Sequence, residues 1–212
     1  MRPTGAVIAL PQMQMRRKRL EITLQKLRPL ETHSARLEQY ETPATVASDV
    51  LWEAFTAGDI HGRAVADLGC GNGVFCIGAK LMGAHRAVGI DVDPGAVRVA
   101  EANAGMLGVE VELIEGDVSS LSGTFDTVLQ NPPFGAQTRH ADRAFIEKAL
   151  SLAPVTYSIH NEGTQEFVGD MVGALGGRSE AIKRYKFEIP YAFEFHRKAS
   201  ETISVVLLKL ER

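Results

Sequence analysis

Four consecutive residues suggest a definite chemistry: Asn131, Pro132, Pro133 and Phe134. The side-chain oxygen of Asn131 and the main-chain carbonyl of Pro132 are both acceptors, so together they could hold the two hydrogens of an amino group. The two prolines stiffen the backbone and contribute no N–H donor, and Phe134 offers a face on which a base could stack. The same tetrapeptide could also be an ordinary turn, because asparagine and proline are favoured turn residues.

A glycine-rich loop lies about 60 residues before this tetrapeptide and favours the catalytic interpretation. It has the form Gly-x-Gly-x-Gly and joins a strand-like run at residues 64–68 to a helical pattern that starts at Val74. In such a unit the glycines let the backbone approach a ligand, and the helix N-terminus offers unpaired amides. A second strand-like run ends in Asp91, whose carboxylate suits two ribose hydroxyls. The loop spacing favours S-adenosylmethionine over a dinucleotide.

Two further strand ends complete the predicted site. Asp117 follows a third strand-like run and could accept a hydrogen bond from the adenine amine, and Asn131 follows a fourth. Ligands of an open parallel sheet collect at the carboxyl ends of its strands, so one cofactor site is expected there. The sulfonium methyl is already activated, and the protein has mainly to align the nucleophile and exclude water. The predicted cofactor contacts are Asp67, Gly69, Cys70, Gly71, Asn72, Gly73, Asp91, Val92, Asp117, Val118 and Asn131.

The elements that must position these residues alternate along the chain. Helical patterns cover residues 16–27, 43–57, 74–82, 94–107, 140–152 and 164–175. Strand-like runs cover residues 64–68, 87–91, 109–113, 124–130, 155–160, 185–195 and 202–210. The alternation predicts an α/β fold with a seven-stranded, mostly parallel sheet, helices on both faces and a C-terminal antiparallel hairpin. Thr42 is expected to cap the second helix, which Pro43 would begin.

Composition limits the possible classes of protein. With 212 residues, 45% of them hydrophobic, the chain can bury one good core and fits one domain. No apolar run reaches the roughly 18 residues of a membrane span, and no signal-peptide pattern is evident, so we expect a soluble, cytoplasmic protein. Cys70 and Cys76 form neither a redox pair nor a zinc site, so reduced thiols and no metal are expected. His160 ends the fifth strand and reads more readily as a structural or hydrogen-bonding residue than as a catalytic one.

The net charge of -3 conceals a segregation of charge along the chain. Residues 16–28 carry six basic side chains and one acid, a formal charge of +5, and residues 178–198 carry six basic and three acidic side chains. Residues 89–126 carry eight acids and one base. Basic ends therefore flank an acidic middle, although a solvated helix face would also explain the first basic run.

The motifs resemble those of class I S-adenosylmethionine-dependent amino-methyltransferases, which have a Rossmann-like fold. Two further runs, Leu-Glu-Gln-Tyr-Glu-Thr at residues 37–42 and Phe-His-Arg-Lys-Ala-Ser at residues 195–200, narrow the resemblance to archaeal-type members of the methyltransferase-like 5 family. The resemblance covers about residues 16–212 and implies methylation of the N6 amino group of an adenosine in small-subunit ribosomal RNA. Glu41 departs from the family's run, in which a proline is expected.

The resemblance also implies roles for residues outside the strand ends. Gln39, Tyr40 and Thr42 would line the cofactor pocket as a lid. A small zinc-binding activator protein would pair with the exposed third strand, between Val109 and Leu113. The basic ends would contact RNA phosphates through Arg16, Arg17, Lys18, Arg19, Arg197 and Lys198. Residues 16–42 are then an N-terminal helix and lid, residues 43–212 the catalytic domain, and residues 1–15 a disordered tail or a misassigned start.

Two alternatives remain open from the sequence. A protein N5-glutamine methyltransferase uses the same Asn-Pro-Pro arrangement on a side-chain amide, but usually ends it in tyrosine where this chain has Phe134, and it carries a separate N-terminal recognition domain. A non-catalytic RNA-binding scaffold could share the fold. The chain retains Asn131, Pro132 and Asp91, which argues against a scaffold that has lost catalytic activity.

Overall fold

The computed structural model describes residues 16–30, 41–133, 141–190 and 200–212. A seven-stranded sheet with the order β3-β2-β1-β4-β5-β7-β6 forms its centre. The strands are β1 (Ala64–Leu68), β2 (Arg86–Asp91), β3 (Glu112–Glu115), β4 (Thr127–Gln130), β5 (Val155–Asn161), β6 (Arg178–Pro190) and β7 (Ser200–Glu211). The first five are parallel, and β7 runs antiparallel to both β5 and β6. The predicted fold class, sheet and hairpin are confirmed.

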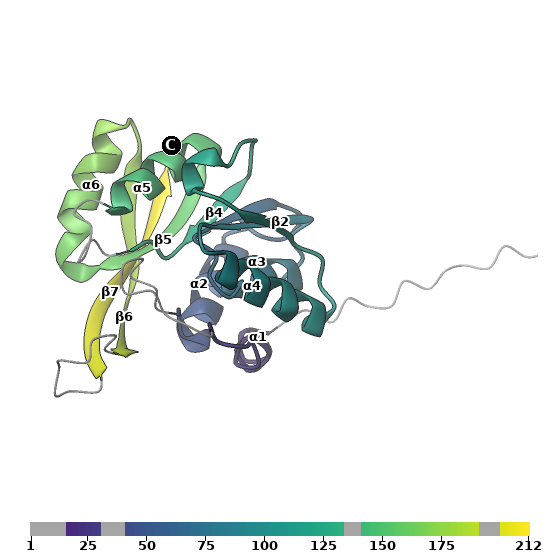
Figure 1. Cartoon of the computed structure of the whole chain (residues 1–212). Coiled ribbons are helices and arrows are strands. Elements are labelled where there is room, and N and C mark those ends of the chain that lie inside the picture. The colour runs from purple at the N-terminus through teal and green to yellow at the C-terminus, as the bar shows by residue number, and fades with distance from the viewer. Residues whose placement is uncertain (1–15, 31–40, 134–140, 191–199) are drawn as a thin grey trace, which may run out of the picture.

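Helices cover both faces of the sheet (Figure 1). One face carries α1 (Arg17–Leu24), α2 (Ala44–Thr56), α3 (Val74–Leu81) and α4 (Pro94–Leu107). The other carries α5 (Ala141–Leu152) and α6 (Gln165–Ala174), which pack on apolar side chains of β7. Short 3-10 helices, η2 (Val118–Ser120) and η3 (Glu162–Thr164), follow β3 and β5. No helix within the described ranges is long and apolar enough to cross a membrane.

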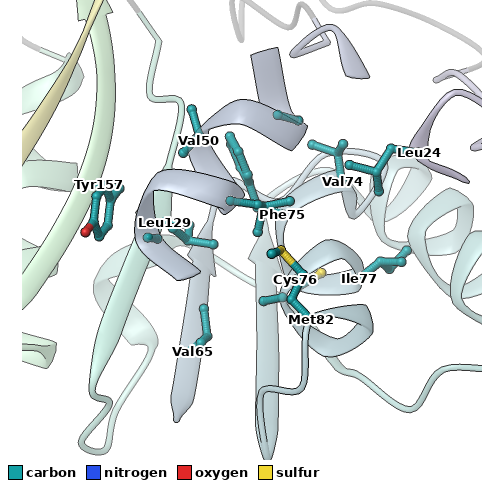
Figure 2. Close-up of a cluster of buried hydrophobic side chains, with 14 of the residues drawn as sticks. Leu24, Val50, Val65, Val74, Phe75, Cys76, Ile77, Met82, Leu129 and Tyr157 are labelled. Carbon is teal, nitrogen blue, oxygen red and sulfur yellow. The ribbon is translucent and has the colours of Figure 1, made fainter. Parts of the chain in front are cut away.

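The larger part of the core lies between the sheet and the first three helices. Figure 2 shows Phe75 and Ile77 of α3 together with Val50 of α2 and Leu129 of β4. All four side chains are at most 3% exposed. Burying a side chain of this size contributes about 1.5–3 kcal/mol, so this cluster fixes α3, and with it the glycine-rich loop, against the ends of β1 and β4.

The third strand lies at the predicted edge of the sheet, but its predicted bounds were wrong. Pairing with β2 starts at Glu112, opposite Val88, and not at residue 109. Gly108 ends α4 with a φ of 64°, and the amide of Val109 donates to the carbonyl of Ala104 at 3.1 Å. Residues 109–111 therefore connect the end of α4 to β3, and their alternation of valine and glutamate is not part of the strand.

The hairpin also starts earlier than predicted. β6 begins at Arg178, which lies opposite Glu211 of β7, whereas the pattern indicated residue 185. β6 is an edge strand, and most of its residues up to Lys186 are exposed. The first half of β6 is rich in charged side chains and lacks the alternation of apolar and polar residues that is typical of a strand. The sequence therefore could not predict where β6 begins.

Candidate cofactor and acceptor site

The three glycines of the loop after β1 all adopt left-handed conformations. Their φ angles are 68° at Gly69, 54° at Gly71 and 86° at Gly73. A Cβ on Gly73 would lie 2.8 Å from Ile77 Cδ1, and one on Gly69 would lie 3.1 Å from Phe145 Cε1. A Cβ on Gly71 would meet nothing within 4 Å. The outer glycines therefore let the loop pack against its helices, and the middle one leaves an open face at which a ligand can approach.

The carboxylate of Asp91 stands beside this open face. Its Oδ2 accepts from the amide of Gly71 at 2.8 Å, and its Oδ1 accepts from the amide of Asp93 at 3.0 Å. Burial raises the pKa of Asp91, although these backbone hydrogen bonds oppose the shift. The side chain is 8% exposed, so two backbone amides fix it at the end of β2.

Asp67 supports the loop from the inside. Its Oδ2 accepts from the amide of Cys76 at 2.9 Å, and its side chain is 1% exposed. Burial raises the pKa of Asp67 to about 7. This carboxylate therefore holds the first turn of α3 from the face of β1 that carries that helix. Cys70 is also buried, and burial raises the pKa of its thiol.

Asn103 is a site-building residue that the sequence reasoning missed. It lies on α4 with a fully buried side chain. Its Oδ1 accepts from the amide of Arg28 at 2.8 Å, and its Nδ2 donates to the carbonyls of Arg28 at 3.2 Å and Asn72 at 3.0 Å. Asn72 in turn donates to the Arg28 carbonyl at 3.4 Å. The segment after α1 is thereby attached to the glycine-rich loop. The sequence did hold one indication of this role, because Asn103 is a polar residue among the apolar residues on the buried side of α4.

The predicted residues beyond β2 and β3 lie on neighbouring strand ends. Val92 is 52% exposed and directly follows β2. Asp117 is exposed, and its Oδ1 accepts from the amide of Ser119 at 2.8 Å, which caps η2. Hydrogen bonding to the side chain of Ser119, and then to its amide, lowers the pKa of Asp117. Val118, the first residue of η2, is buried. Val92 and Asp117 therefore follow the ends of the neighbouring strands β2 and β3.

Asn131, the predicted acceptor for the substrate amine, directly follows β4 and is half-buried. Its Nδ2 donates to the hydroxyl of Thr42 at 2.9 Å. Thr42 therefore does not cap α2 as predicted: Pro43 occupies the N-cap position and Thr42 bonds across 89 residues to Asn131 instead. Glu41 holds the same segment, because its Oε1 accepts from the amide of Leu30. The predicted residues Gln39, Tyr40 and Phe134 lie outside the described residues.

The basic run at the start of α1 is exposed at Arg16, Arg17, Lys18 and Arg19. Arg17 pairs with Asp49 of α2 at 3.1 Å, and Lys18 pairs with Glu21 at 3.1 Å. The predicted contacts Arg197 and Lys198 lie outside the described ranges.

Taken together, the residues at the ends of β1 and β2 fit S-adenosylmethionine. Gly71 leaves room for the ligand beside the backbone, and the fixed carboxylate of Asp91 is an acceptor for ribose hydroxyls. In the sheet order β2, β1 and β4 are neighbours, so Asn131 lies at the same edge as the loop. The strand ends are neighbours as predicted, and their joint binding of one cofactor stays a prediction.

Comparison with known proteins agrees with this geometry. The Methyltransferase small domain family matches residues 43–154, more than half of the chain. The rRNA N(6)-adenosine-methyltransferase METTL5 of Danio rerio is 32% identical over 92% of this chain and 98% of that protein. The chain belongs to the methyltransferase-like 5 family.

Two archaeal proteins are similar to this chain over more than nine-tenths of its length. An uncharacterized protein of Methanocaldococcus jannaschii is 38% identical over 93% of this chain and 95% of its own length. A crystal structure from Pyrococcus horikoshii superposes with a TM-score of 0.87 at 40% identity, covering 94% of this chain and 99% of that one. As a member of the family, the protein is an S-adenosylmethionine-dependent methyltransferase.

Proposed function

We propose that this enzyme methylates the N6 amino group of an adenosine in small-subunit ribosomal RNA. The observation that carries the proposal is the placement of Asn131: it follows β4 beside the cofactor loop and its amide nitrogen is engaged by Thr42. With Nδ2 donating to Thr42, Oδ1 is the end of the amide that can accept from a substrate amine. The name of the Danio rerio relative, an rRNA N(6)-adenosine-methyltransferase, supports the same acceptor.

The chemistry asked of the protein is positioning. An adenine amino group is a poor nucleophile because its lone pair is delocalised into the ring. Asn131 Oδ1 and the carbonyl of Pro132 would hold its two hydrogens and favour a more tetrahedral nitrogen as the new bond forms. The bound cofactor supplies an activated methyl group. The alkylated nitrogen then loses a proton readily, so no strong general base is needed, and Phe134 would stack on the base.

Charge on the described surface supports an RNA acceptor. The start of α1 presents a basic run to solvent, and two further arginines, Arg28 and Arg98, line a hollow of about 560 Å³ between α4 and the segment after α1. Lysine and arginine side chains in such positions can neutralise phosphates. We assign RNA contact to the predicted basic residues, including Arg197 and Lys198, and the role of lid to Gln39, Tyr40 and Thr42.

We also propose that the edge strand β3 receives a partner, a small zinc-binding activator protein. β3 is four residues long, and its far side has no neighbour in the sheet that the described residues form. Ile114 of this strand is 36% exposed, which suits a strand added alongside. A cytoplasmic location, where ribosomal RNA is available, completes the proposal.

The test uses cofactor labelled with tritium in its methyl group. Purified enzyme is incubated with small ribosomal subunits, the RNA and protein are separated, and the RNA is digested to nucleosides. Label should be recovered as N6-methyladenosine, and Asn131→Ala should lose this labelling while keeping most of its affinity for S-adenosylhomocysteine, because the other predicted cofactor contacts are unchanged. Label in protein would favour the glutamine methyltransferase. Cofactor binding with no transfer to either fraction, with and without the activator protein, would favour a scaffold.

A further inference from the structure

One face of β5 carries three polar side chains where apolar ones would be expected. Thr156, Ser158 and His160 alternate along the strand, and each is at most 1% exposed. The residues opposite them on β7 are, in the same order, Leu210, Leu208 and Val206. All three belong to the apolar cluster that α5 and α6 cover. Buried polar groups in such surroundings require hydrogen-bond partners, so this polar stripe calls for an explanation other than packing.

Two residues of this stripe, Ser158 and His160, are joined by hydrogen bonds to Gln130, the last residue of β4. Gln130 Nε2 donates to Ser158 Oγ at 3.0 Å, and Ser158 Oγ lies 2.6 Å from His160 Nε2. Burial lowers the pKa of His160 to about 4, so the ring is neutral at pH 7 and the chain of hydrogen bonds carries no charge. Gln130 is itself fully buried.

This chain of hydrogen bonds is a poor device for stability alone. Gln130 Oε1 and Thr156 Oγ1 have no hydrogen-bond partner among the residues that the structure describes. If the Gln130 amide were turned over, Nε2 would be left without a partner in place of Oε1. Unpaired buried polar atoms destabilise a core, and apolar side chains of similar shape would pack there without that cost.

The residues after Gln130 show what the chain of hydrogen bonds can do. β4 ends at Gln130, and Asn131 is followed by two prolines, which have no N–H with which to extend the ladder. Side-chain hydrogen bonds therefore help to position Asn131. Thr42 holds Asn131 from the face of the sheet that carries α2, and Ser158 holds Gln130 from the opposite face.

We propose that Ser158 and His160 are positioning residues for methyl transfer, acting through Gln130 to fix the end of β4 and thereby the amide of Asn131. The inference rests on the proposed function, which makes Asn131 the residue that receives the substrate amine. The predicted cofactor contacts lie mainly at the ends of β1 and β2. Loosening the chain should therefore slow transfer and leave cofactor binding as it is.

The variant Ser158→Ala tests this because it removes the hydroxyl that joins Gln130 to His160. Thr156→Val is the matched control: it lies on the same face of the same strand, is equally buried, and loses a hydroxyl that has no partner among the described residues. Three quantities are measured: the rate of methyl transfer to ribosomal RNA at saturating cofactor, the Kd for S-adenosylhomocysteine, and the NMR signals of the Asn131 side-chain amide in the absence of RNA.

Ser158→Ala should lower the transfer rate at least tenfold, keep the Kd within twofold, and shift or broaden the Asn131 signals. Thr156→Val should change none of the three, and Ser158→Thr, which keeps the hydroxyl, should recover most of the rate. A wild-type rate or unchanged Asn131 signals in Ser158→Ala would overturn the inference, as would an equal loss of rate and cofactor affinity. If the wild type labels no RNA, the proposed function fails and the NMR comparison still decides. If Ser158→Ala does not fold, Gln130→Leu carries the same expectations.

Discussion

Replacing Asn103 by alanine tests whether the cofactor loop depends on the segment after α1. The variant loses three hydrogen bonds, two to the backbone of Arg28 and one to the carbonyl of Asn72. Both bonds to Arg28 are partly buried, and each contributes about 0.5–1.5 kcal/mol. The Asn72 carbonyl would be left buried without a partner, which costs about 1–3 kcal/mol.

These contributions sum to a loss of about 2–6 kcal/mol, with a mid-range value of about 4 kcal/mol, in the free energy of unfolding. At about 2–4 °C per kcal/mol for a chain of this length, the mid-range loss should lower Tm by about 8–16 °C, measured by circular dichroism. Calorimetry should show about tenfold weaker binding of S-adenosylhomocysteine, because Asn72 belongs to the loop.

Glu101→Ala is the matched control, since Glu101 is exposed on the same helix and its loss should change the free energy of unfolding by less than about 0.5 kcal/mol. A Tm within about 2 °C of the wild type would refute the reasoning for Asn103. A large fall in Tm with unchanged cofactor affinity would show that Asn103 serves stability alone.

Three further predictions concern buried titratable groups. Asp91→Ala should raise the cofactor Kd more than tenfold, or about 1.4 kcal/mol by calorimetry, and a smaller change would count against ribose binding. Folding raises the pKa of Asp67 from 3.8 to about 7, so the folded state binds that proton more tightly than the unfolded state. The wild type should therefore lose stability relative to Asp67→Asn as pH rises from 4 to 7 in urea unfolding, and a constant difference would contradict this. Burial raises the pKa of both Cys70 and Cys76, so at pH 8 the native thiols should react with a disulfide reagent roughly 100-fold more slowly than in urea; equal rates would disprove their burial.

The parts of the fold that sequence predicted are those with a local signal. Glycines at positions 69, 71 and 73 mark a turn whose φ angles only glycine adopts easily, and the alternation of strands and helices limits the sheet to a few arrangements. The start of β6 was not predictable, because its exposed charged residues are strand residues only through their pairing with β7.

The contacts that build the site were less predictable than its residues. Asn131 and Thr42 were both predicted, but the hydrogen bond between them spans 89 residues and has no local pattern. Asn103 was missed for the same reason, since its partner Arg28 lies 75 residues away. His160 was correctly interpreted as a hydrogen-bonding residue, and only the structure reveals Ser158 as its partner.

The position of β7 affects how the protein can be made. Residues 205–211 pair with every residue of β5, although 38 residues, 162–199, separate the two strands in the sequence. During synthesis, β5 therefore leaves the ribosome with one edge of unpaired backbone groups that nothing covers until β7 follows, a state prone to aggregation. A stop codon or frameshift that removed only these residues would leave the ends of β1, β2 and β4 intact in sequence. It should nevertheless abolish activity, through misfolding and degradation of the nascent chain.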